Sequence, residues 1–126
     1  MKYILLHYVG EVGWPQLTKV EQQEWLGALK AYAEAMTRAG VLTSAVGLKM
    51  SSAARTVRLA NGRTHVLDGP YANSKEQLAA FHIIDVADFD AALAWGARSP
   101  TALYGVVEVR PLMDKSLDDL LRELAG

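Results

Sequence analysis

The sequence contains no cysteine. This absence excludes disulfide bonds, thiolate nucleophiles and metal centres with cysteine ligands, and it is usual in a reducing compartment. Lysine and arginine number 13 against 14 aspartates and glutamates, so the chain also lacks the basic excess that binds nucleic acid or anionic lipid. We therefore expect a cytoplasmic protein with no nucleic-acid partner.

Long hydrophobic runs are absent as well. No segment approaches the roughly 20 apolar residues of a membrane span, so no membrane partner is expected. The apolar run near the N-terminus is short, is interrupted by His7, and has no small-residue cleavage site after it. We interpret it as a buried strand rather than a signal peptide. At 126 residues, 51% of them hydrophobic and 21% charged, the chain fits one globular domain.

Local signals predict alternating strands and helices. Thr18 and Glu21 have the spacing of a capping box, and Gly40 is a typical stop for the helix that follows. A second helix is expected over 88–98, and Ser116 is expected to cap a short third helix. The predicted strands are rich in β-branched and aromatic residues and cover 2–9, 41–49, 55–60, 63–68, 78–85 and 104–110.

Asn61-Gly62 predicts a tight hairpin, because a type I′ turn needs positive φ at both central residues. A two-residue loop pairs Ala60 with Arg63. Counting back along the strands then sets Val57 opposite Val66 and Arg55 opposite Asp68.

Without this hairpin the order is strand, helix, strand, strand, helix, strand. The order predicts an α+β domain of the ferredoxin-like βαββαβ type, with an inserted β-hairpin and with the first and third main strands at the centre of the sheet. We expect the domain to cover residues 1–112 and a C-terminal helical extension to cover 113–126.

Alternation along the strands divides the sheet into two faces. One parity is apolar and is expected under the helices: Ile4, Leu6, Phe81, Ile83, Val107 and Val109. The other mixes apolar and polar side chains: Tyr3, Leu5, His7, Ala80, His82, Ile84, Val106, Glu108 and Arg110. Two helices cover only one face, so we expect a second copy to cover the other. The product is a homodimeric α/β barrel with polar groups in the cavity between its sheets.

The segment Leu67-Asp68-Gly69-Pro70-Tyr71 is followed by Lys75-Glu76 and the apolar strand that contains Phe81. In this pattern the chain resembles the DGPF family, also called YCII-related. The opening Met1-Lys2-Tyr3, the run 39–42 and Glu108-Val109-Arg110-Pro111 add to the likeness, which extends over about residues 1 to 112.

The resemblance implies a dimeric ferredoxin-like barrel, similar in fold to small isomerases and cofactor-free monooxygenases. Members of the family often accompany sigma factors of the extracytoplasmic type, and their own activity is generally unassigned. Tyr71 and Ala79-Ala80 stand where the family usually has Phe and Gly-Gly.

Three residues are candidates for catalysis. His82 lies mid-strand and can exchange protons near neutral pH; its structural alternative is a half-buried histidine bonded to the backbone or to a partner. Asp68 is a candidate base in a turn, or else a partner of Arg55 across the hairpin. Glu108 is expected to orient a histidine ring.

Four further residues are candidates for ligand binding: His7, which approaches His82 if their strands are neighbours, Tyr71, Lys75 as an anion contact, and Arg110. Two histidines and a carboxylate also supply metal ligands, but no close spacing supports such a site, so neither a metal nor a cofactor is expected. Two functions remain open. One is a small-molecule binder or enzyme with an acid–base site in the dimer cavity, and the other is a non-catalytic regulatory or scaffolding module beside a sigma-factor system.

Overall fold

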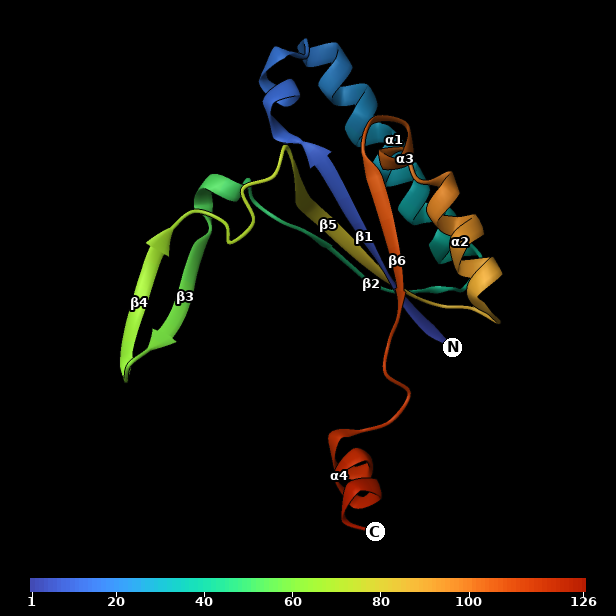
Figure 1. The fold of residues 1–126 in the computed structure, drawn as a ribbon. Helices are drawn as coiled ribbons and strands as arrows, with labels where there is room; N and C mark the ends of the chain where they lie inside the picture. The colour runs from blue at the N-terminus through green and yellow to red at the C-terminus, as the bar shows by residue number, and fades with distance from the viewer.

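The computed structural model describes residues 1–126 and is an α+β structure with two sheets. The larger sheet is antiparallel, and its four strands lie in the order β2-β5-β1-β6. Helices cover one face of this sheet (Figure 1). The bounds are β1 Lys2–Gly10, β2 Leu42–Gly47, β5 Glu76–Asp85, β6 Val106–Pro111, α1 Lys19–Arg38, α2 Phe89–Arg98 and the short α3 Thr101–Tyr104.

The central strands β1 and β5 are the first and third main strands, as predicted. This topology is compatible with the ferredoxin-like arrangement. The capping box is present: the Glu21 amide donates to Thr18 Oγ1 at 3.1 Å, and the Thr18 amide donates to the Glu21 carboxylate at 2.8 Å. Gly40 follows the helix with a φ of 72°, so the left-handed position after α1 is occupied by the residue that adopts it most easily.

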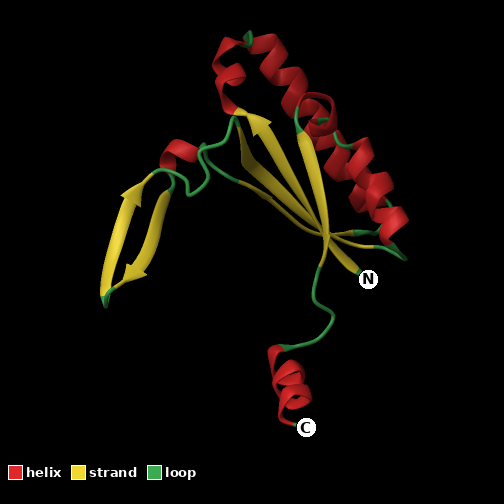
Figure 2. Ribbon diagram, in the orientation of Figure 1, coloured by secondary structure: helices red, strands yellow, loops and turns green.

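The hairpin forms with the predicted register. Strands β3 (Arg55–Ala60) and β4 (Arg63–Asp68) pair through Val57 with Val66 and Arg55 with Asp68. Asn61 and Gly62 have φ values of 52° and 72°, as a type I′ turn requires. The hairpin is a separate two-stranded sheet that extends away from the larger one (Figure 2).

The predicted division of the sheet faces is wrong on β1 and β5. Tyr3, Leu5, His7, His82 and Ile84 are buried, and they lie beneath the helices in contact with the Tyr32 and Met36 core. Both parities of β1 are strongly apolar, so alternation alone does not identify the inward one. The strand register decides it: Leu5 pairs with Val109 and His7 with Val107, and directly paired residues share a face. The prediction was right for Val107 and Val109, which lie against α2 at Gly96.

The face without helices therefore carries a different set of side chains. Ile4 pairs with Ile83 and Arg110, and Leu6 pairs with Phe81 and Glu108. This bare face is still half apolar. It carries isoleucine, leucine and phenylalanine side chains, and the two histidines that were expected there lie on the other face.

Three short elements were not predicted: the 3₁₀ helices η1 (Glu11–Gln16) and η2 (Ser51–Ala53), and α3, whose last residue was expected to begin a strand. A tight contact joins α3 to β1, because a Cβ on Gly105 would lie 2.0 Å from the Tyr8 carbonyl oxygen. Only glycine allows the chain after α3 to approach β1 so closely. The final helix α4 (Leu117–Ala125) starts at the predicted cap Ser116. No helix here has the length and apolar character to cross a bilayer.

Candidate functional site

Two histidines meet beneath the helices. Nε2 of His7 on β1 lies 2.7 Å from Nδ1 of His82 on β5. The side chains are 2% and 8% exposed. The approach of His7 to His82 was predicted, and it follows from the register, because Leu5 pairs with His82 and His7 with Ala80. The two histidines are thus diagonal neighbours on one face of adjacent strands.

The pair belongs to a longer hydrogen-bonded chain. Nδ1 of His7 lies 3.3 Å from the hydroxyl oxygen of Ser99, and that oxygen accepts the Thr101 amide at 3.2 Å. Nε2 of His82 has no protein partner, yet no buried side-chain nitrogen or oxygen is left without one. The Nε2 atom of His82 is therefore not fully buried, and it is the end of the chain that has no partner within the protein.

Tyr32 of α1 packs edge-on against both imidazoles, with ring centroids 6.3 Å from His7 and 5.6 Å from His82. Its hydroxyl donates to the Trp95 carbonyl oxygen of α2 at 2.6 Å. Burial raises the pKa of Tyr32 to about 12. The phenol therefore stays protonated and provides a neutral wall for the pair.

Burial keeps the two histidines neutral. It lowers the pKa of His7 to about 4, with a further contribution from the charge of His82, and it lowers the pKa of His82 as well. In a neutral pair one ring donates the shared proton and the other accepts it. With Ser99 donating to His7, Nε2 of His82 carries a hydrogen; in the reverse arrangement it offers a lone pair. The chain can therefore act as an acid or as a base at one atom.

The other predicted catalytic residues do not join this pair. Glu108 lies on the bare face, where its carboxylate accepts the Tyr8 hydroxyl at 3.3 Å, so it cannot orient a histidine ring through the sheet. Asp68 is on the hairpin with its carboxylate 3.6 Å from Arg55. Asp68 therefore pairs with Arg55 across the hairpin, which is the alternative to a catalytic base.

The remaining predicted ligand contacts are also dispersed. The ring of Tyr71 lies 5.9 Å below the Arg58 guanidinium, Lys75 is exposed in the loop before β5, and Arg110 is on the bare face. Only His7 remains beside His82. No group of three or more histidine, aspartate or glutamate side chains is placed to hold a metal ion.

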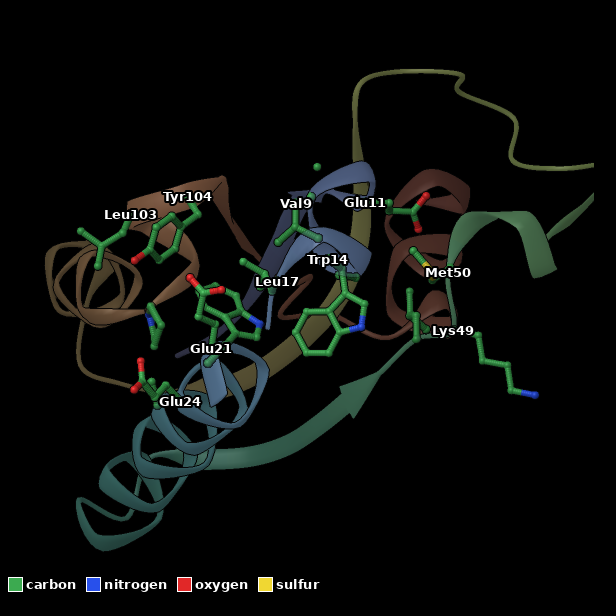
Figure 3. A pocket seen from close by; sticks show the side chains of 17 residues that line it. Val9, Glu11, Trp14, Leu17, Glu21, Glu24, Lys49, Met50, Leu103 and Tyr104 are labelled. Carbon is green, nitrogen blue, oxygen red and sulfur yellow. The ribbon is translucent and has the colours of Figure 1, made fainter. Parts of the chain in front are cut away.

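A cavity of about 730 Å³ opens where β1 ends (Figure 3). Its wall is mainly apolar, and Trp14, Trp25 and Tyr104 provide the aromatic surface. The rings of Trp25 and Tyr104 pack edge to face at 5.4 Å. Its charged residues are Glu11, Glu21, Glu24 and Lys49, and the Lys49 side chain is directed away from the others (Figure 3).

Neither histidine lines the cavity, but the elements that hold the pair extend into its wall. Val9 in its wall is two residues beyond His7 on β1, and Pro100 follows Ser99 directly. Ala28 is one helical turn before Tyr32. Each of the three elements that hold the pair therefore continues into the wall of the cavity.

Sequence reasoning missed Ser99 and the cavity. Ser99-Pro100 has the pattern of a helix stop, and Trp25 lies at helical spacing with Tyr32 and Met36 as a core residue would, so neither indicates a site. Trp14-Pro15 has the pattern of a rigid apolar loop whose simplest role is packing; it lies in η1, where Trp14 lines the cavity. A clustering of three aromatic residues in non-adjacent segments leaves no periodic signal, so only the fold could reveal it.

The chain is an α+β protein with a buried histidine pair and with a cavity where β1 ends. Residues 1–116 match the YCII-related domain. The chain is also 37% identical over 114 residues to an uncharacterized protein of Rhizobium meliloti (strain 1021), a match that covers 89% of this chain and 92% of that protein. The chain therefore belongs to the YCII-related family, as its sequence pattern indicated.

The buried histidines predict acid sensitivity. The pKa of His7 falls from 6.5 to about 4 on folding, so between these values the unfolded chain binds a proton that the folded chain does not. Stability is therefore full above about pH 6.5 and is progressively lost as the pH falls toward 4. Urea unfolding at a series of pH values should show this slope.

The same titration of His7→Gln should have a shallower slope over that window, even though the variant is less stable throughout. His65→Asn is the matched control, because His65 is exposed on the hairpin, and it should keep the wild-type slope. Parallel curves for wild type and His7→Gln would assign the acid sensitivity to other groups.

Proposed function

We propose that the protein binds a small molecule in the cavity beside the His7–His82 pair and exchanges a proton with it at His82. The observation that carries this proposal is the 2.7 Å contact of two buried histidines. Replacing a packed apolar pair with two imidazoles weakens a core unless their polarity is used. In this proposal the acid–base site lies within one protomer, beneath its own helices, rather than between the sheets of two copies.

The geometry supports a relay rather than a single base. Ser99, His7 and His82 form one chain of hydrogen bonds. A proton taken up at Nε2 of His82 leaves one positive charge on the pair, which moves to His7 when the Nδ1 proton of His82 passes to its Nε2 atom. Such a group suits proton removal next to a carbonyl or from an ammonium.

The cavity wall favours a ligand with an apolar body and a positive charge. Trp25 and Tyr104 offer aromatic surface, which attracts cations through the ring quadrupole. Glu21 and Glu24 lie on the same stretch of α1, and Glu24 has no ion-pair or hydrogen-bond partner in the chain. Apolar pockets with a few charged groups are the usual form of small-molecule sites. We therefore expect an aromatic or alkyl amine.

Benzylamine tests the role of His82, with the fluorescence of Trp14 and Trp25 reporting its binding. Acidification should weaken binding to the wild type, because protonated His82 loses its lone pair and repels the ammonium. The effect should approach about tenfold per pH unit once the pH lies below the pKa of the pair. His82→Asn should bind benzylamine with a weaker dependence on pH than the wild type over the same range.

His65→Asn should keep the wild-type pH profile, since His65 lies on the exposed hairpin. An equal pH effect in wild type and His82→Asn would disprove the proton exchange. Failure to bind any amine or neutral probe would favour the alternative, a regulatory module without a ligand.

Glu24→Gln tests the ligand charge. The loss of one carboxylate should lower the affinity for benzylamine by roughly fivefold to tenfold and leave that for benzyl alcohol, its neutral isostere, unchanged. Glu34→Gln is the control on the same helix, because Glu34 pairs with Lys30 away from the cavity. Equal loss for both probes would mean that Glu24 shapes the wall without selecting charge.

We also propose that the protein is a homodimer that buries the bare face of the sheet. Only 12 of the 126 residues are buried, few for a chain in which 51% of the residues are hydrophobic. Leu6 pairs with Phe81 and Ile4 with Ile83 on this face, without a covering helix. Apolar patches of this kind are typical of subunit contacts.

Phe81→Glu tests the dimer, because it introduces a charge at the centre of the bare face. Sedimentation equilibrium should show a dimer for the wild type and a folded monomer for the variant, with a dissociation constant at least about a hundredfold higher. Leu26→Glu, at an exposed leucine of α1, should remain dimeric. A wild-type protein that is monomeric at high concentration would overturn this part of the proposal.

A further inference from the structure

Helix η1 forms part of the cavity wall without burying a residue. It connects β1 to α1, and its Glu11, Gly13 and Trp14 line the cavity. A 3₁₀ helix of 6 residues is longer than usual, because its hydrogen bonds have poorer geometry than those of an α-helix. Neither apolar burial nor its own backbone therefore fixes η1. Its position depends on polar contacts with neighbouring segments.

Two sets of hydrogen bonds hold η1 in place. At its start the Glu11 carboxylate accepts the Ser51 amide at 2.6 Å and also the Ser51 hydroxyl. Near its end the Trp14 carbonyl oxygen accepts the Gln22 side chain at 3.1 Å and the Leu17 amide at 3.2 Å. The second set is local, whereas the Glu11–Ser51 contact joins segments 40 residues apart. This contact ties η1 to η2.

The Glu11–Ser51 contact also joins two parts of the cavity wall. Residues 48–50 line the cavity and lead directly into η2, and Figure 3 shows Glu11 beside Met50, the residue before Ser51. Glu11 and Ser51 are half-buried and lie outside the hydrophobic core. A carboxylate is a stronger acceptor than a neutral oxygen, so the contact holds η1 firmly. Breaking it does not require the core to unfold.

We infer that Glu11 and Ser51 form a latch that holds η1 and Trp14 against residues 48–50 and so closes the cavity over a bound molecule. Glu11 is a positioning residue, because it binds Ser51 rather than the ligand and acts through Trp14. When the latch opens, η1 moves away and the aromatic wall loses Trp14. The inference rests on the binding site proposed above and adds the step that controls ligand entry and release.

Hydrogen exchange of the Leu17 amide tests the latch without a ligand. This amide donates to the Trp14 carbonyl oxygen, at the opposite end of η1 from Glu11, so it reports the opening of η1 as a whole. In Glu11→Ala, exchange of the Leu17 amide followed by NMR should be at least about tenfold faster than in the wild type. The Val41 amide, which donates to the Met36 carbonyl oxygen, should keep its wild-type rate, because the core stays closed.

Two partial variants should give graded effects. Ser51→Ala loses the hydroxyl donor and keeps the amide, and Glu11→Gln keeps an oxygen acceptor and loses the charge. In both, Leu17 should exchange at a rate between those of the wild type and Glu11→Ala. Ser52→Ala is the matched control, because Ser52 is the exposed neighbour of Ser51, and it should keep the wild-type rate.

Ligand binding connects the latch to the cavity. Ser51→Ala changes no charge, so it should lower the affinities for benzylamine and benzyl alcohol by the same factor, about threefold to tenfold. Saturating benzyl alcohol should also slow the exchange of the Leu17 amide in the wild type, because the bound molecule favours the closed latch.

The outcomes separate the latch from the binding site. Unchanged Leu17 exchange in Glu11→Ala would reject the latch and leave the cavity as the proposed site. Equal acceleration of the Leu17 and Val41 amides would also reject it, because the whole fold would then be weakened. A wild type that binds neither probe would reject the proposed function, and the control of ligand release would fall with it.

Discussion

The register of β1 against β5 determines everything else in the candidate site. Pairing Leu5 with His82 and His7 with Ala80 places the two imidazoles on one face as diagonal neighbours. A shift of one residue would turn His7 toward the bare face and separate the pair by the thickness of the sheet. The register is fixed on both sides, because β6 pairs with the other edge of β1 and brings Val107 and Val109 under α2.

The buried histidine pair lowers the stability of the fold unless each of its polar atoms has a hydrogen-bond partner. Two neutral imidazoles, Ser99 and Tyr32 occupy the middle of a small core, and each polar atom there needs a partner. That need is met internally everywhere except at Nε2 of His82. The proposed acid–base role rests on this nitrogen, because it is the end of the hydrogen-bonded chain that has no partner within the protein.

Local signals predicted most of the fold. The capping box at Thr18, the turn at Asn61-Gly62 and the strand order were all correct, because each depends on a few adjacent residues or on element order. The inward face of β1 was wrong, since Ile4, Leu5 and Leu6 are apolar on both parities. Ser99 and the cavity could not be predicted, because they arise where α2, η1 and β1 converge in space.

The exposed elements have a common physical origin. The turn at Asn61-Gly62 fixes the shape of the hairpin, and Ser116 fixes the start of α4, but neither signal fixes a position relative to the sheet. The position of an element in a fold is set by the apolar surface that it buries against its neighbours. Within one chain, little apolar surface is available for the hairpin or for α4 to pack against. A segment whose packing is completed by another copy needs two properties. Its local geometry must be well specified, and its apolar face must have no partner within its own chain. The bare face of the sheet meets the same description, because its strands are fixed by their register and no helix of the chain covers its apolar side chains.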